Sequence, residues 1–157
     1  MKKIRIGFKI IKTIDLFGEF FTFGQRLALN KAFQSDSHFE CLKNIILILH
    51  DITIKPRHVP KLIGYYKDIL QKMEKWMQRE QSIHYTPTAE EKQAGYDNVY
   101  KELGDFSVVD SIALRITKTH DDVLAMPYST VFLMLKKDFH QARLERNLNK
   151  IHERKWK

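Results

Sequence analysis

Apolar residues near the start of the chain recur at every second position. The apolar positions of this run are Ile4, Ile6, Phe8 and Ile10. A repeat of two is typical of a half-buried strand, and the intervening residues give this strand a basic face. Residues 15–18 have the composition of a turn, and the Phe-rich residues 20–23 can form a returning strand. The pattern therefore predicts an N-terminal β-hairpin over about residues 3–23, which must pack on other elements because an isolated hairpin is only marginally stable.

After this hairpin the apolar positions follow the 3.6-residue period of amphipathic helices. Several helix starts carry the capping-box pattern, in which Ser or Thr is followed three residues later by Glu or Gln. These pairs are Thr22 with Gln25, Ser37 with Glu40, and Thr88 with Glu91. Pro60 begins a helix that continues to about Glu80, and Gly104 is expected to end the helix that Thr88 begins. The helical body is predicted to extend over about residues 24–126.

A long basic helix is predicted over about residues 128–154, and it carries two apolar stripes that are rotated relative to each other. The first stripe consists of Val131, Phe132, Leu135 and Phe139, and the second consists of Leu144, Leu148 and Ile151. Basic residues surround the second stripe, among them Arg143, Arg146 and Lys150. Two interpretations remain open. Either the helix bends so that both stripes reach one core, or the second stripe leaves the domain and docks on a partner, as amphipathic helices do in grooves.

Length and composition indicate one folded domain. The chain has 157 residues, a normal length for a domain with its own hydrophobic core. It contains only 6 Gly and 4 Pro, which argues against long structureless linkers. We therefore predict a mainly α fold. It consists of one small helical domain over residues 1–157, which begins with the β-hairpin and ends with the long basic C-terminal helix.

Charge and hydropathy limit the classes of partner. The formal net charge of +8 favours acidic partners, although it can also serve solubility alone. No stretch approaches the ~20 apolar residues needed to span a bilayer. Charged residues also interrupt the apolar run that would make the N-terminus a signal peptide. The single cysteine, Cys41, suits a reducing compartment, so we expect a cytoplasmic protein without a membrane partner.

Nothing in the sequence assembles into a catalytic, cofactor-binding or metal-binding site. His38 and Cys41 have the spacing of a ligand pair, but no second pair completes a tetrahedral zinc site. The sequence contains no Gly-x-Ser-x-Gly turn, no His-Glu-x-x-His pair and no phosphate-binding glycine loop. We therefore expect no enzymatic activity, no cofactor and no metal ion, and a role in binding other macromolecules.

Residues 113–123 have the spacing of a helix-turn-helix, with a small residue, a turn position, a helix cap and an apolar residue. These positions are Ala113, Thr117, Thr119 and Val123. Together with the positive net charge, this pattern favours DNA binding. However, Asp121 and Asp122 begin the second helix, where phosphates or base edges would lie, and Pro127 limits that helix to about two turns. We expect no sequence-specific DNA binding and only weak, non-specific binding of nucleic acid.

Residues 109–135 resemble the C-terminal part of the tail assembly chaperones of long-tailed bacteriophages. The similarity rests on an alanine-containing helix, an Asp-rich short helix that ends in Val-Leu, a Met-Pro pair and the start of a long terminal helix. In this chain these segments are residues 110–113, 119–124, 126–128 and 131–132. Most of the remaining chain resembles phage-encoded proteins of this kind more loosely.

The resemblance implies a role in building virions, without catalytic residues. Such chaperones bind the tape-measure protein, a long helical and aggregation-prone chain, and keep it soluble until the tail tube protein assembles around it. For this chain we expect a partner of that kind in the cytoplasm of a bacterial host, or a second copy of the chain, bound by the second stripe and its basic neighbours. Two alternatives remain open: a connector or scaffold component of a phage particle, and a basic helix-turn-helix-like nucleic-acid-binding protein.

Overall fold

A computed structural model describes the backbone of residues 3–155, and the side chains in that range except those of residues 97, 99–101, 153 and 155. The strands are β1 (Lys3–Ile6) and β2 (Lys9–Lys12). The helices are α1 (Phe23–Ala32), α2 (His38–His50), the short 3-10 helix η1 (Pro56–His58), α3 (Val59–Gln81), α4 (Ala89–Gln93), α5 (Tyr96–Leu103), α6 (Asp105–Ile116), α7 (His120–Ala125) and α8 (Tyr128–Lys155). The predicted mainly α fold with an N-terminal hairpin and a long C-terminal helix is confirmed.

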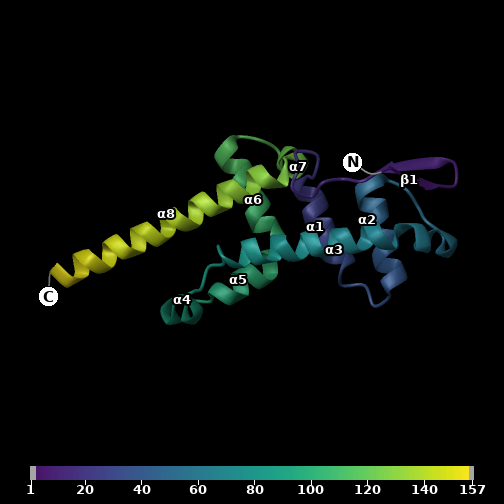
Figure 1. Ribbon diagram of the computed structural model, residues 1–157. Coiled ribbons are helices and arrows are strands. Elements are labelled where there is room, and N and C mark those ends of the chain that lie inside the picture. Colours follow the sequence, from purple (N-terminus) through teal and green to yellow (C-terminus); the bar gives the residue numbers. More distant parts are fainter. Residues whose placement is uncertain (1–2, 156–157) are drawn as a thin grey trace.

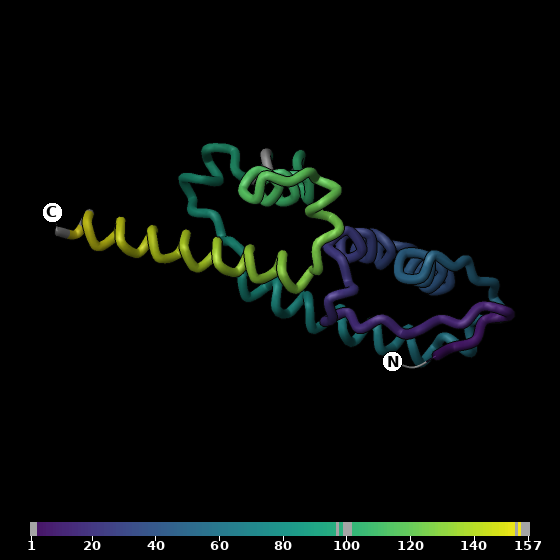
Figure 2. The backbone as a smooth tube through the Cα atoms, turned by 90° about the horizontal axis from the view of Figure 1, so that it is seen from above, coloured from purple at the N-terminus to yellow at the C-terminus, as the bar shows by residue number. Residues whose placement is uncertain are grey.

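The molecule is elongated, with the hairpin at one end and α8 reaching out at the other (Figure 1). A view from above shows the same separation, and the last turns of α8 extend beyond all other elements (Figure 2). Helix α3 runs along the long axis between these two ends. The hairpin and the last turns of α8 therefore form separate surfaces.

The hairpin is tighter than the sequence predicts. Strand β1 pairs antiparallel with β2, and Ile6 lies opposite Lys9, so the turn consists of Gly7 and Phe8 alone. Gly7 adopts a φ of 60°, which glycine reaches without steric cost and which suits the first central position of a two-residue hairpin turn. The prediction of a single strand over residues 4–10 is wrong because the chain reverses at this glycine.

The early turn changes which residues face the core. Ile11 is buried and Ile10 is exposed, although the alternating pattern predicts a buried Ile10. The predicted hairpin over residues 3–23 therefore ends at Lys12, and residues 20–23 form no second strand. The alternating pattern was misleading because, after a two-residue turn, the buried positions of the second strand are shifted by one residue relative to those of a single continuous strand.

The Phe-rich segment before α1 instead ties α1 to α8. Phe21 and Phe23 are both buried. The backbone carbonyl of Phe21 accepts a hydrogen bond of 2.8 Å from the amide of Tyr128, and the amide of Phe23 donates to the carbonyl of Met126 at 2.9 Å. These contacts fix the first residue of α8 beside the first residue of α1.

Two of the three predicted capping boxes are present. The Thr22 hydroxyl accepts a hydrogen bond from the Gln25 amide, and the Gln25 side chain accepts one from the Thr22 amide. Thr88 and Glu91 are paired in the same way. Ser37 makes no side-chain cap hydrogen bond, although α2 begins directly after it.

The helix that Thr88 begins is shorter than predicted. It ends at Gln93 rather than at Gly104. Gly95 has a φ of 91°, outside the helical region, and a second helix, α5, follows it. The predicted single helix is therefore two helices, α4 and α5.

Trp76 of α3 connects the N-terminal segment with α8. Its buried indole N–H donates a 2.9 Å hydrogen bond to the carbonyl of Leu16. Its ring stacks on Phe17, with centroids 4.9 Å apart, and meets the rings of Tyr128 and Phe132 edge to face. Such aromatic pairs add to the stability that area burial provides.

Helix α3 is amphipathic rather than uniformly apolar. Along α3 the buried side chains are Leu62, Tyr65, Ile69, Met73 and Trp76. These positions follow the 3.6-residue period, so one face is buried and the opposite face is polar. Within residues 3–155 no helix combines the length and the apolar character that crossing a bilayer requires.

A buried ionic cluster joins α1, α3 and α8. The Arg26 side chain is only 3% exposed, and its Nε and Nη2 atoms lie 2.9 and 2.5 Å from the two carboxylate oxygens of Glu80. Asn30 accepts from the same guanidinium group, and the Tyr128 hydroxyl donates to Glu80. Burial, followed by the hydrogen bond to Glu80, raises the pKa of Tyr128 well above its usual range, so the hydroxyl keeps its proton.

Removing one partner of this cluster is expected to cost more than removing both. Glu80→Met leaves the Arg26 guanidinium, which is only 3% exposed, without its anion and should lower the free energy of unfolding by about 3 kcal/mol. Arg26→Met leaves a carboxylate that is 28% exposed and should cost less, and the double variant Arg26→Met/Glu80→Met should lose less than Glu80→Met alone. Urea unfolding measures these differences. If the double variant loses as much as the two single variants together, the cluster is not a coupled buried pair.

Candidate functional site

Helix α8 presents its two apolar stripes to different surroundings. Val131 and Phe132 of the first stripe are buried, and Leu135 packs against the core. In the second stripe Leu144, Leu148 and Ile151 are 59%, 44% and 49% exposed. The helix continues past the body instead of bending back to it (Figures 1 and 2). The core therefore does not bury the second stripe, in contrast to one of the two interpretations of the sequence.

The exposed stripe is part of a longer apolar face. At about 100° per residue, Leu144, Leu148 and Ile151 lie within about 60° of one another around the helix axis. The exposed Leu133 lies on the same side of the helix, about 27 Å from Ile151 along the axis. Lys137 and His140 interrupt this side between them. We call Leu133, Leu144, Leu148 and Ile151 the α8 apolar face.

The three basic residues predicted beside the stripe have different roles. Arg143 and Lys150 are exposed, but they lie about 80–100° around the helix from the nearest member of the α8 apolar face, on the flank toward Arg146. Arg146 lies on the opposite side of the helix, where its guanidinium carbon is 4.1 Å from the ring centroid of Tyr85 and its Nη2 is 3.3 Å from Glu91. Arg146 therefore attaches α8 to Tyr85 and to Glu91 of α4, and its predicted contact with a partner stays a prediction.

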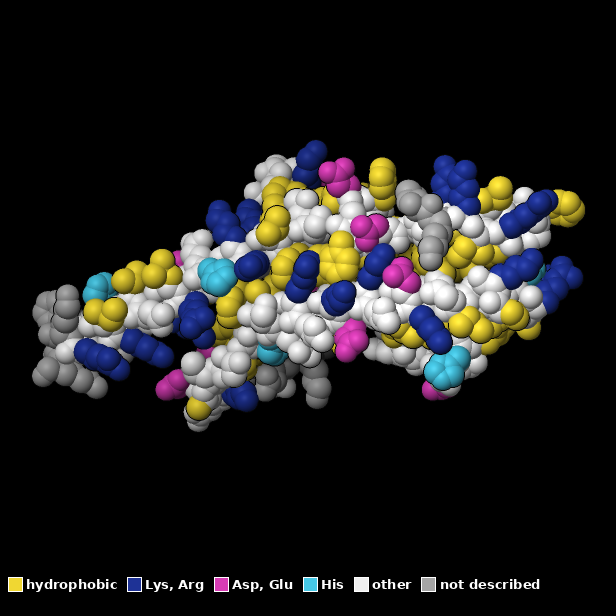
Figure 3. All heavy atoms as spheres, in the orientation of Figure 1, with side chains coloured by type: hydrophobic (Ala, Val, Ile, Leu, Met, Phe, Trp, Pro, Cys, Tyr) yellow, Lys and Arg dark blue, Asp and Glu magenta, His cyan; other side chains and the backbone are white. Residues whose placement is uncertain are grey.

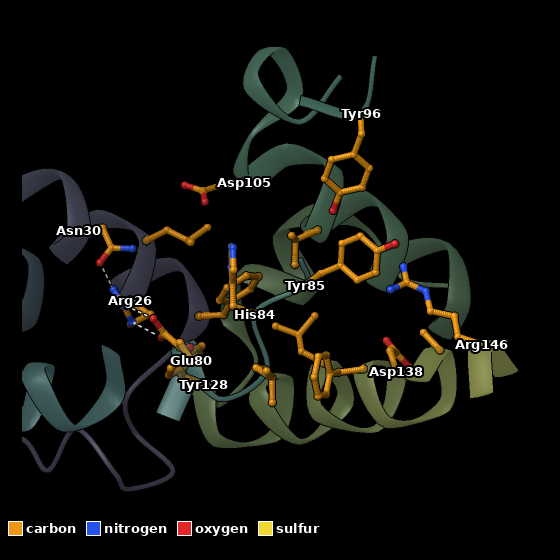
Figure 4. Close-up of a pocket in the computed structure, with 17 residues that line it drawn as sticks. Arg26, Asn30, Glu80, His84, Tyr85, Tyr96, Asp105, Tyr128, Asp138 and Arg146 are labelled. Atoms are coloured by element: carbon orange, nitrogen blue, oxygen red, sulfur yellow. Dashed lines mark hydrogen bonds and ion pairs between the residues drawn. The ribbon is translucent and has the colours of Figure 1, made fainter. Parts of the chain in front are cut away.

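A pocket that the sequence did not indicate lies where α1, α3, α6 and α8 meet (Figure 4). Its volume of about 740 Å³ falls within the range of small-molecule sites. Phe23, Tyr85, Tyr96 and Phe139 contribute aromatic walls, and the Arg26–Glu80 pair also lines it. These residues come from segments far apart in sequence, so no local pattern could have revealed the pocket.

Many of the charged groups in this pocket already have partners within the molecule. Glu80 pairs with Arg26, and Arg146 pairs with Glu91. Asp138 forms a 2.5 Å ion pair with Arg115. Across the described residues, no group of three or more His, Cys, Asp or Glu side chains is placed to hold a metal ion. The pocket thus offers an apolar cavity whose ionic groups mainly stabilise the fold.

Helices α6 and α7 form a helix-turn-helix at the predicted positions. Thr117 adopts the left-handed conformation, with φ 54° and ψ 51°, where glycine is usual. Ala113 and Val123 are buried between the helices. Thr119 caps α7 by accepting a hydrogen bond from the amide of Asp122. The spacing therefore predicted the local geometry correctly.

The second helix of this motif carries negative charge at its start. Helix α7 has only 6 residues, and both Asp121 and Asp122 are exposed in its first turn. Hydrogen bonds from the Thr119 backbone, and then from its hydroxyl, lower the pKa of Asp122, which keeps this carboxylate ionised. Two carboxylates in the first turn of a recognition helix would repel DNA phosphates.

Comparisons with protein-family models, curated proteins and solved structures give no significant match to the chain. The functional interpretation therefore depends on the surfaces described above, and the resemblance of residues 109–135 stays a prediction. In the structure this segment covers most of α6, all of α7 and the first turns of α8. It thus includes the first turns of α8, which attach this helix to the body of the molecule.

The α8 apolar face is expected to contribute little to the stability of the folded chain. Leu144→Ser and Leu148→Ser should each change the free energy of unfolding by no more than about 0.5 kcal/mol, because these side chains are exposed. Val131→Ala, in the buried stripe of the same helix, should cost about 1–3 kcal/mol. Chemical denaturation of the three variants measures these free energies of unfolding. A large loss of stability in Leu144→Ser or Leu148→Ser would show that the second stripe is part of the core.

Duplex DNA is expected to bind without sequence selectivity. The acidic start of α7 prevents base contacts, so any binding comes from phosphate contacts and should fall steeply between about 50 and 200 mM salt. Selection from a random duplex library, followed by titration at both salt concentrations, measures this behaviour. A tight, site-selective complex at physiological salt would show that α7 reads DNA despite Asp121 and Asp122.

Proposed function

We propose that this protein binds a helical protein partner through the α8 apolar face, and that the partner is the tape-measure protein of a long-tailed bacteriophage. The observation that carries the proposal is the exposure of Leu144, Leu148 and Ile151 on a helix that extends beyond the body. The resemblance of residues 109–135 to tail assembly chaperones supports the choice of partner. In this role the protein acts by binding in the bacterial cytoplasm and not by catalysis.

The energetics of this surface suit a reversible chaperone. Burying three such side chains would contribute about 1.5–3 kcal/mol each. A micromolar complex requires about 8 kcal/mol in total, so these contacts supply a large part of it. A client with apolar helical faces would thereby be kept from aggregating, and it could still be released when tube protein assembles around it.

The charge within the apolar face favours a foreign partner over a second copy of the chain. Lys137 interrupts the face itself, and Arg143 and Lys150 lie farther around the helix, about 80–100° from its nearest member. Two parallel copies pairing through this face would bring their Lys137 side chains together, which is unfavourable. In a complex with another protein, the same cations would orient the partner and speed its association.

The test is co-expression with the tape-measure protein from the same genome. The parent protein should keep this client in the soluble fraction, and Leu144→Ser/Leu148→Ser should fail to do so because the apolar contact is lost. The matched control is Leu47→Ser/Leu114→Ser, which removes two exposed leucines from α2 and α6. The control should behave like the parent.

Three outcomes would contradict parts of this proposal. A folded Leu144→Ser/Leu148→Ser variant that still solubilises the client would exclude the α8 apolar face as the binding surface. A parent protein that never binds the client would exclude the chaperone function. Stoichiometric amounts of the protein in purified virions would identify it instead as a connector or scaffold component of the particle.

A further inference from the structure

The hairpin has one face toward the core and one toward solvent. Residues directly opposite each other in an antiparallel pair share a face, so Ile4 and Ile11 lie on one side, next to Ile6. Ile6 and Ile11 are buried. The other side carries four exposed residues, namely Lys3, Arg5, Ile10 and Lys12. We call this side the basic hairpin face.

The cations of the hairpin have no carboxylate partner in the part of the chain that the structure describes. None of Lys3, Arg5, Lys9 and Lys12 forms an ion pair there. Residues 3–12 contain no Asp or Glu. Lys3 lies directly opposite Lys12, and like charges in this position destabilise a strand pair. The charge pattern therefore does not stabilise the strand pair, and it leaves these cations available to an external anion.

An aromatic side chain stands at the tip of the same hairpin. Phe8 is fully exposed, so its ring contacts nothing in its own chain. It follows Gly7 in the turn, at the end of the molecule opposite α8 (Figure 1). In the space-filling view, Lys or Arg and hydrophobic side chains occur together at this end (Figure 3).

We propose that the hairpin binds single-stranded nucleic acid without sequence selectivity. Lys3, Arg5 and Lys12 contact phosphates along the backbone, and an unstacked base stacks on the Phe8 ring. Proteins that bind single strands combine these two features, a positively charged track and an aromatic platform. A duplex is a poorer ligand, because its bases are already stacked and cannot reach the ring.

The distribution of charge favours nucleic acid over a lipid surface. A membrane approached by the tip would take up Phe8 and meet Arg5 and Lys9, but Lys3 and Lys12 lie about 10 Å behind the turn at ~3.3 Å per residue. That distance is about one Debye length in physiological salt, where attraction to the surface is largely screened. A linear polyanion that lies along the strands can contact all of these cations at once.

The test is a fluorescence-anisotropy titration of a labelled oligothymidylate of about 16 nucleotides at several NaCl concentrations. Arg5→Gln/Lys12→Gln should reduce the slope of log K against log salt by about 1.4, since each phosphate contact to a single strand contributes about 0.7. Phe8→Ala should weaken binding by about 5- to 150-fold at unchanged slope, because it removes stacking and no charge.

Matched controls separate the hairpin from general charge and exposure. Lys67→Gln/Lys75→Gln removes the same charge from the exposed face of α3, and Phe20→Ala removes a largely exposed aromatic outside the hairpin. Both controls should bind like the parent. Lys12→Gln should raise Tm by relieving the repulsion from Lys3, so its loss of affinity cannot come from unfolding.

Several results would overturn the proposal. These are an absence of oligothymidylate binding, tighter binding of a duplex of equal length, or controls that weaken binding as much as the hairpin variants do. Phe8-dependent binding to vesicles containing phosphatidylserine, without binding of the oligonucleotide, would assign the hairpin to membranes instead. None of these outcomes bears on the α8 apolar face, which lies at the other end of the molecule.

Discussion

The contact between Arg26, Glu80 and Tyr128 determines the arrangement on which the rest of the structure depends. Arg26 is almost completely buried in α1, and a guanidinium group does not lose its charge in proteins. Its position therefore requires a carboxylate from another element, because an unpaired buried charge is very costly. Glu80, next to the last residue of α3, supplies this carboxylate, and Tyr128 at the start of α8 donates to it. One buried charge thus determines where three helices meet.

The direction of α8 follows from this junction. Its first turns bury Val131 and Phe132 against the body, where Phe132 meets Trp76. Beyond Arg146, which is attached to Tyr85 and Glu91, the helix extends past the other elements. Leu148 and Ile151 consequently stay exposed, since no described part of the chain covers them. The molecule thereby acquires an apolar helix face at one end and a basic hairpin at the other.

Features that depend on residues close together in the sequence were predicted correctly. The capping boxes at Thr22 and Thr88 involve residues three positions apart, so the sequence alone reveals them. The same approach failed where a glycine permitted a backbone reversal that the apolar pattern does not record. Gly7 divides the predicted first strand into a complete hairpin, and Gly95 lies between two helices where one was expected. A glycine permits positive φ but does not require it, so only the structure showed where this freedom is used.

By itself the sequence determined the mainly α character, the helix-turn-helix spacing at Thr117 and the rotation between the two stripes of α8. These features depend on periodicity and on neighbours within one or two turns. Tertiary structure alone decided which stripe is buried, that Arg146 meets Tyr85 and Glu91, and that Arg26 meets Glu80 across 54 positions of sequence. The physical reason is that burial and charge pairing depend on the element that lies opposite a side chain, and distant segments reach that place only through packing of the whole chain.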